Sequence, residues 1–161
     1  MIPRKKRQKY KKGDVFVVPL CDGTYSLGQV LSPEPKALNS VACAYYSLRI
    51  VDGPILDIPT PLPLDNLISV TLTTPDLLNR ATWPVVADRT VNVPSKKRPY
   101  ERYRSKEWVG AKIIGSGIIR QFLNAYFGLA PWDAMDDPNY YESLLLDPSL
   151  KPSGLIYERA A

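Results

Sequence analysis

The sequence predicts an α+β fold: a strongly bent antiparallel β-sheet or SH3-like open barrel, followed by two C-terminal helices. Three observations favour this fold class. An Asp22-Gly23 pair separates two β-rich runs, sixteen prolines among 161 residues favour short elements and many turns, and the apolar spacing becomes helical from Ile113 onward. At this length, with 45% hydrophobic residues, we expect one globular domain with a substantial core.

The two β-rich runs, residues 15–20 and 25–31, predict a β-hairpin. Asp-Gly suits a two-residue loop, because both central positions of a type I′ turn need a positive φ. Such a loop would pair Val18 with Leu27 on one face of the hairpin, which we expect to be core. Gly28 offers no side chain for packing, so we expect the hairpin to bend there or to lie at a sheet edge.

Further strands are predicted over residues 41–51, 67–72 and 83–87, which are rich in β-branched and aromatic residues. Prolines alternate with apolar residues between 54 and 63, a pattern that excludes a helix and favours an extended connection. Thr-Pro-Asp at 74–76 predicts a single helical turn that ends at Asn79.

Two helices are predicted near the C-terminus. The first has Ser116 as its N-cap and Gly128 as its stop. The second has Asp137 as its N-cap, with a proline at the first helical position. Their apolar faces are Ile118, Ile119, Phe122, Leu123, Tyr126 and Phe127 in the first helix, and Tyr140, Tyr141, Leu144 and Leu145 in the second.

Two blocks of the sequence resemble the bacterial Imm26 immunity-protein family. The N-terminal block is Gly13-Asp14-Val15-Phe16, Leu20, Asp22-Gly23, Tyr25 and Gly28-Gln29-Val30-Leu31. The C-terminal block is Gly128-Leu129-Ala130-Pro131-Trp132, Asp137-Pro138-Asn139-Tyr140 and Leu144-Leu145-Leu146. The resemblance implies a cytoplasmic protein that binds and neutralises a partner toxin of a polymorphic or contact-dependent system without turnover. The family also carries a phosphotriesterase label.

The residue inventory weighs against hydrolysis, because the chain contains no histidine. Metal-activated hydrolases commonly use imidazole ligands, and serine or cysteine nucleophiles commonly use a histidine base. An all-carboxylate metal site stays open, although the acidic residues show no familiar ligand spacing. We therefore predict no catalytic residues, no metal and no cofactor, and lean towards a protein that is not an enzyme.

The formal charge of +5 is concentrated at the N-terminus. Residues 1–12 hold seven of the 21 cations, which leaves 14 cations against 16 acids in residues 13–161. We expect residues 1–12 to form a disordered basic tail and residues 13–161 to form the single domain. The tail either solubilises the protein or contacts phosphates of nucleic acid or a membrane surface.

A signal peptide is not predicted, although a basic start precedes an apolar run at residues 15–21. That run is short, contains Pro19, and has a leucine directly before Cys21, where cleavage would need a small residue. No apolar stretch approaches the roughly 20 residues of a membrane span. Cys21 and Cys43 lack CxxC spacing, which suits free thiols in the cytoplasm, and we predict that compartment without membrane association.

A basic segment runs from Arg89 to Lys112, with eight cations, two acids and three interleaved aromatic residues. Phosphates attract cations and bases stack on aromatic rings, so this pattern is typical of a nucleic-acid surface. The alternative is a solvated loop anchored by its tyrosines. The candidate phosphate-binding residues are Lys96, Lys97, Arg98, Arg102 and Arg104.

An acidic segment follows from Trp132 to Asp147, with five acids and no cation. A cationic toxin would be steered by such a surface and held by its aromatic residues. The alternative is structural, with the tyrosines in the core and an aspartate as a helix cap. The candidate partner-binding residues are Trp132, Asp133, Asp136, Asp137, Tyr140, Tyr141 and Glu142.

A competing interpretation comes from the hairpin, because Gly13-Asp14-Val15 and residues 28–32 also resemble the start of MazF-type endoribonuclease toxins. Those small curled barrels cleave RNA without histidine, and the resemblance would make this chain a ribonuclease or a nucleic-acid-binding barrel. Arg49 or Arg89 would then stabilise the developing phosphorane. The chain is longer than that family and lacks its arginine-proline context after Leu31.

Overall fold

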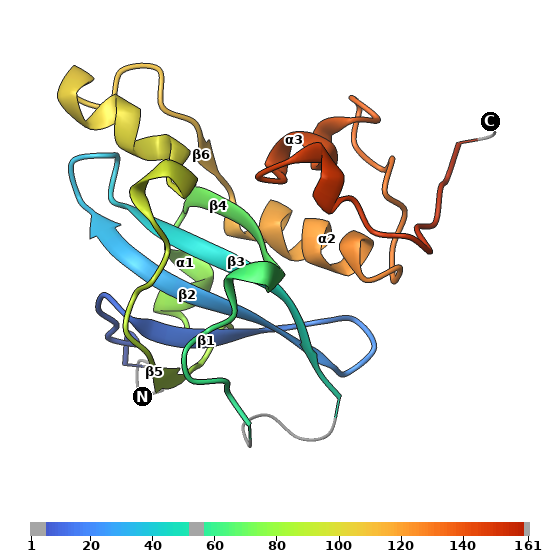
Figure 1. Cartoon of the computed structure of the whole chain (residues 1–161), viewed down its shortest axis with the longest axis horizontal. Helices are drawn as coiled ribbons and strands as arrows, with labels where there is room; N and C mark the ends of the chain where they lie inside the picture. Colours follow the sequence, from blue (N-terminus) through green and yellow to red (C-terminus); the bar gives the residue numbers. More distant parts are fainter. Residues whose placement is uncertain (1–5, 52–56, 160–161) are drawn as a thin grey trace, which may run out of the picture.

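The computed structural model describes residues 6–51 and 57–159. Its centre is an open six-stranded sheet with the order β5-β1-β2-β3-β4-β6, shown in Figure 1. Neighbouring strands are antiparallel except for the parallel pair β4 and β6. The strands are β1 (Asp14–Pro19), β2 (Tyr25–Glu34), β3 (Ser40–Ile50), β4 (Leu67–Thr73), β5 (Val85–Asp88) and β6 (Ile113–Ile114). The predicted α+β class is confirmed, and the sheet does not close into a barrel.

The helical elements are short, apart from α2. They are α1 (Asp76–Asn79), α2 (Ser116–Tyr126), α3 (Tyr140–Leu144) and the 3-10 helices η1 (Leu64–Asn66), η2 (Ser95–Lys97), η3 (Pro99–Lys106) and η4 (Pro148–Leu150). The helical turn before Asn79 and the two C-terminal helices are therefore confirmed. Gly128 ends α2 as predicted, with a φ of +74° that suits a left-handed C-terminal residue.

The helix starts differ from the predictions. Ser116 is not the N-cap but the first residue of α2, and its hydroxyl donates to the carboxylate of Asp76 in α1 at 2.6 Å. Asp137 is not the N-cap of α3 either, because Asn139 occupies that position. The Asp137 carboxylate instead accepts a hydrogen bond from the Asn139 amide at 2.9 Å. Asp137 thus stabilises the turn before α3, whereas Ser116 joins the start of α2 to α1.

The remaining predicted strands are confirmed within two residues as β3, β4 and β5. The extended connection predicted for 54–63 lies partly outside the described residues, and its described part, 57–63, contains neither strand nor helix. Residues 113–114 depart from the prediction, because they form β6 instead of beginning a helical pattern. Their carbonyl and amide groups extend the sheet beside β4.

The β1–β2 hairpin is one residue out of the predicted register. Val18 lies opposite Ser26 instead of Leu27, because the loop contains the three residues 21–23. Gly23 has a φ of +86°, the left-handed conformation that completes a three-residue hairpin loop. A slip of one residue exchanges the faces of the sheet, so Val18 and Leu27 belong to different cores.

Gly28 makes room for an aromatic cluster. Phe16 lies opposite Gly28, and a Cβ atom on the glycine would come within 2.4 Å of the phenyl ring. That ring stacks on Trp83 with centroids 5.4 Å apart and meets Tyr45 edge-on at 6.1 Å. Buried aromatic pairs of this kind contribute packing area and about 0.5–1.5 kcal/mol beyond it. The glycine that the sequence marks as a weak point in the strand is thus required by the core.

Both faces of the sheet are buried, whereas the sequence predicted one core face near the hairpin tip. The first core, which includes Trp83 and Trp132, is covered by the three α-helices. The second core, which includes Val17, Leu62 and Tyr100, is covered by the segments around η1 and η3. β-bulges interrupt the β1–β5, β2–β3 and β3–β4 pairs, and such bulges bend a sheet. This explains the bend that was predicted.

Part of the predicted basic tail is attached to the domain. The Gln8 side chain donates hydrogen bonds to the backbone carbonyls of Leu78 in α1 and of Trp83 after it, at 2.8 and 3.0 Å. The Tyr10 hydroxyl donates to the side-chain oxygen of Asn79 at 2.9 Å. Residues 1–5 lie outside the described residues. Residues 8–10 therefore pack against α1, and the domain boundary at residue 13 stays a prediction.

Candidate functional site

The turn between β2 and β3 adopts a backbone conformation that one of its residues disfavours. Leu38 and Asn39 have φ angles of +54° and +56°. Asparagine tolerates the left-handed region, whereas a leucine there is strained. The Leu38 side chain is also 85% exposed. Backbone strain of this kind gathers at functional sites, so the exposed leucine marks the turn as a candidate.

An ion-pair network holds η3 against this turn. The Arg104 guanidinium donates to both carboxylate oxygens of Glu34, at 2.9 and 2.7 Å, and to both of Glu101, at 2.8 and 3.0 Å. It also lies over the ring of Trp108, 4.8 Å from the centroid. The hydrogen bonds to Glu101 and Glu34 raise the pKa of Arg104, and the bond from Arg104 lowers the pKa of Glu101. The network fixes the position of the indole.

A pocket of about 630 Å³ opens on the η3 side of the turn. Glu107 and Trp108 both have positive φ angles, +54° and +67°, and Val109 directly after them is 74% exposed. The residues that line the pocket are Glu34, Pro35, Lys36, Arg104, Glu107 and Trp108. We call residues 33–41 together with 104–109 the turn site.

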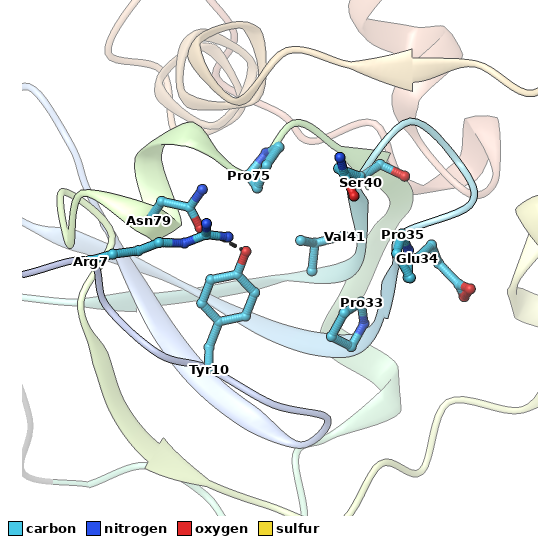
Figure 2. A pocket seen from close by; sticks show the side chains of 10 residues that line it. Arg7, Tyr10, Pro33, Glu34, Pro35, Ser40, Val41, Pro75 and Asn79 are labelled. Carbon is cyan, nitrogen blue, oxygen red and sulfur yellow. Dashed lines mark hydrogen bonds between the residues drawn. The ribbon is translucent and has the colours of Figure 1, made fainter.

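A second pocket, of about 470 Å³, opens on the α1 side of the same turn. Figure 2 shows that Arg7, Tyr10 and Asn79 point toward one another along one side of it, and that Glu34 points away. The Tyr10 hydroxyl donates to the side-chain oxygen of Asn79 at 2.9 Å, and the Arg7 guanidinium lies beside that hydroxyl. Burial raises the pKa of Tyr10, and the neighbouring Arg7 acts against this rise. The opposite wall contains Pro33, Pro35, Ser40, Val41 and Pro75.

The acidic segment has its aromatic residues inside the protein. Trp132 and Tyr141 are 1% and 2% exposed, and both pack against Phe122 with centroids 5.9 Å away. The Asp133 carboxylate accepts hydrogen bonds from the backbone amides of Glu158 and Arg159, at 2.7 and 3.0 Å, and the first of these lowers its pKa. These three predicted partner-binding residues serve the fold and the attachment of the C-terminal segment.

The other four predicted partner-binding residues reach the surface. Asp136 and Asp137 are exposed, and Tyr140 and Glu142 are half-buried. The Glu142 carboxylate accepts a hydrogen bond from Lys151 at 2.5 Å, which lowers its pKa. The surface that the acidic segment offers is therefore narrower than predicted and has fewer free charges.

The predicted phosphate-binding residues do not form one surface of free cations. Arg98 donates twice to the backbone carbonyl of Val93, at 2.9 and 2.7 Å, and Arg104 is engaged by Glu34 and Glu101. Arg102 lies over the ring of its neighbour Tyr103 at 4.8 Å. Lys96 and Lys97 form no ion pair with the described residues.

Both arginines of the ribonuclease interpretation have structural partners. Arg49 forms an ion pair with Asp22 and donates to Thr24 at 2.9 Å, which closes the hairpin loop onto β3. Arg89 donates to the backbone carbonyls of Ile58, Pro59 and Asp88, at 2.8, 3.0 and 2.7 Å.

The described residues form neither a metal-binding cluster nor a membrane-spanning helix. Residues 6–51 and 57–159 contain no group of three or more histidine, cysteine or acidic side chains arranged to hold a metal ion. Within the same ranges, no helix has both the length and the apolar character needed to cross a bilayer.

The family model of Imm26, immunity protein 26, matches residues 11–108, more than half of the chain. This chain belongs to the Imm26 family. The match contains β1 to β5 and the turn site except Val109, and it ends before α2, so the C-terminal block of the predicted resemblance lies outside it. Searches of curated proteins and of solved structures found no significant match.

The turn site was not found from the sequence, although Arg104 was selected there as a phosphate ligand. The available signal was Leu38, a large apolar residue in a turn-like stretch, residues 33–40, that contains two prolines and an Asn-Ser pair. Trp108 was counted with the basic segment, because its stacking on Arg104 depends on Glu34, 70 positions away from that arginine.

Proposed function

We propose that this chain is an immunity protein of the cytoplasm that binds a cognate protein toxin in a stoichiometric complex and neutralises it without turnover. Membership of the Imm26 family carries this proposal. The matched residues form five strands of the sheet and all of the turn site except Val109, a framework that presents a strained and exposed apolar loop. Such a surface suits recognition of a protein.

The turn site is the surface that we propose for toxin docking. Binding hot spots combine a tryptophan or arginine anchor with neighbouring apolar contacts. Trp108 and Arg104 form such an anchor beside a pocket, and Leu38 and Val109 add exposed apolar area. Because Glu34 already fixes Arg104, little side-chain freedom would be lost when a partner binds.

The acidic surface, consisting of Asp136, Asp137, Tyr140 and Glu142, is a second proposed docking surface. Its charge favours a cationic toxin, for example one that acts on nucleic acid. Its aromatic anchors Trp132 and Tyr141 lie in the core, so contact there would depend mainly on exposed charge, which contributes less to affinity than buried rings.

The experiment is co-expression with the toxin encoded by a neighbouring gene, followed by growth measurement and purification of the complex. We expect the wild-type chain to restore growth and to co-purify with the toxin in a fixed ratio. A turn-site variant with Leu38→Asn and Trp108→Ala should lose protection, whereas Asp136→Lys with Asp137→Lys should keep it. Val51→Asn is the matched control, because Val51 is 65% exposed and follows the opposite end of β3.

The outcomes separate the candidates. Loss of protection only in the aspartate variant would transfer the docking site to the acidic surface. The ribonuclease interpretation would be supported instead if the wild-type chain arrested growth without any toxin and if Arg49→Ala or Arg89→Ala, in a folded variant, relieved that arrest. A neighbourhood without a toxin gene, together with no protein that co-purifies, would contradict the immunity function.

A further inference from the structure

The pocket on the α1 side of the turn has a set of hydrogen-bond donors on one wall. The Tyr10 hydroxyl donates to the side-chain oxygen of Asn79, which lines the pocket, so the amide nitrogen of that asparagine remains as a donor. The Arg7 guanidinium, which carries five N–H groups, lies beside the Tyr10 hydroxyl on the same wall. The wall therefore offers donors and a positive charge.

The acidic residue that lines this pocket does not balance that charge. Both carboxylate oxygens of Glu34 accept hydrogen bonds from Arg104, and one also accepts from Ser32. Figure 2 shows the Glu34 side chain directed away from Arg7, Tyr10 and Asn79. Among the described residues, no carboxylate oxygen lies within 4.0 Å of the Arg7 guanidinium. An anionic group would complete this wall.

A buried hydroxyl gives a second, independent indication. Ser40 lines the same pocket, is 2% exposed, and its Oγ atom has no hydrogen-bond partner among the described residues. Buried polar atoms are almost always hydrogen-bonded, so this hydroxyl is available to a polar group that enters the pocket. Because a hydroxyl can donate or accept, it suits an oxygen ligand.

We propose that this pocket binds a carboxylate group, supplied by an aspartate or glutamate side chain of the partner protein. A planar carboxylate matches the guanidinium fork of Arg7, and its second oxygen can accept from the amide of Asn79. The prolines and Val41 of the opposite wall accommodate the apolar stem of such a side chain. The identity of the partner rests on the proposed immunity function, whereas binding of the carboxylate does not.

The test is a titration of the full-length protein followed by backbone and side-chain amide NMR shifts. The probe is acetyl-glutamate amide, which carries one carboxylate, and acetyl-glutamine amide is its neutral counterpart. We expect saturable shifts at Ser40, Val41 and the Asn79 side chain with the first probe alone, with a Kd on the order of 10 mM for a single charged contact.

Two variants test the assigned donors. Arg7→Gln removes the cation, and Asn79→Asp keeps the oxygen that accepts from Tyr10 while replacing the donor with a second carboxylate oxygen. Each variant should raise the Kd for acetyl-glutamate amide at least fivefold. Lys9→Gln is the matched control, because it removes an exposed cation from the same segment without lining the pocket, and its Kd should match the wild type.

Three results would overturn the proposal. The first is the absence of a saturable shift with acetyl-glutamate amide, and the second is an equal shift with the neutral probe. The third is a Kd for inorganic phosphate that is equal to or lower than the Kd for acetyl-glutamate amide, which would assign the pocket to phosphate. A Kd unchanged by Arg7→Gln would overturn the assigned wall. Because the titration needs no toxin, its failure leaves the co-expression experiment intact, and a failed co-expression experiment leaves a positive titration in place.

Discussion

The turn site and the acidic segment both combine aromatic residues with charge, yet the structure places their apolar side chains in opposite environments. In the acidic segment, Trp132 and Tyr141 enter the core and only the charges remain outside. At the turn site, an internal ion pair neutralises Glu34, while Leu38 and Val109 are 85% and 74% exposed. The difference teaches that backbone conformation decides whether the apolar side chains of a charged stretch are buried or exposed.

The strongest test of this contrast is Trp132→Ala. Removal of a fully buried indole should lower the free energy of unfolding by about 3–5 kcal/mol, because both its transfer energy and its packing are lost. Urea unfolding followed by circular dichroism would measure the loss. Tyr140→Ala is the control in the same segment, and it should lose far less because Tyr140 is half-buried. A stable Trp132→Ala variant with weakened toxin binding would instead make Trp132 part of the interface.

Glu34→Gln tests the ion pair that supports the turn site. The neutral amide keeps the shape of the side chain but loses charge-assisted bonds from Arg104, which is itself 48% exposed. Solvent screening limits the expected decrease in the free energy of unfolding to about 1–2 kcal/mol. Trp108 is the one tryptophan of three that is not fully buried, so acrylamide quenching of fluorescence reports on it.

The quenching should increase in Glu34→Gln, because Arg104 is then held less firmly over the indole. Glu107→Gln is the matched control, since Glu107 lines the same pocket but forms no ion pair among the described residues. Equal quenching in both variants would show that Glu34 does not position Trp108.

Asp76 joins the helices that lie next to the two regions: it belongs to α1, which lines a pocket beside the turn, and accepts from Ser116 at the start of α2, which packs against the acidic segment. Burial acts to raise the pKa of Asp76, but hydrogen bonds from Ser116 and Thr74 outweigh it and lower the pKa. The folded state therefore binds fewer protons than the unfolded state in acid, and the stabilisation present above about pH 4 is lost as the pH falls through the lowered pKa.

We expect Asp76 to contribute about 1 kcal/mol to this acid-dependent loss of stability. Urea unfolding at pH 5, 4 and 3 should show a smaller decline for Asp76→Asn than for the wild type. Ser116→Ala removes one of the two hydroxyl donors and should give an intermediate decline. Identical profiles for all three proteins would refute this account of the link between α1 and α2.

Local patterns were sufficient to predict most strands, the α+β class, both C-terminal helices and the family. They did not give the hairpin register, because the Asp-Gly pair fits a two-residue loop whereas the hairpin closes with the three residues 21–23, and Phe16 then packs over Gly28. They also did not separate core from surface in the acidic segment, since the burial of Trp132 depends on contacts with α2. The turn site was missed for the same reason, because η3 is held there by a contact between distant residues.

The smallest expected effect on stability is the most informative about function. Leu38→Asn replaces a strained, exposed leucine with a residue that tolerates a φ of +54°, so the free energy of unfolding should stay equal or rise by about 0.5 kcal/mol. Affinity for the toxin, measured by calorimetry, should nevertheless fall about tenfold as apolar contact is lost. Val51→Asn should leave that affinity unchanged. An unchanged affinity in Leu38→Asn would remove the main reason to place docking at the turn, since the fold itself does not need this leucine.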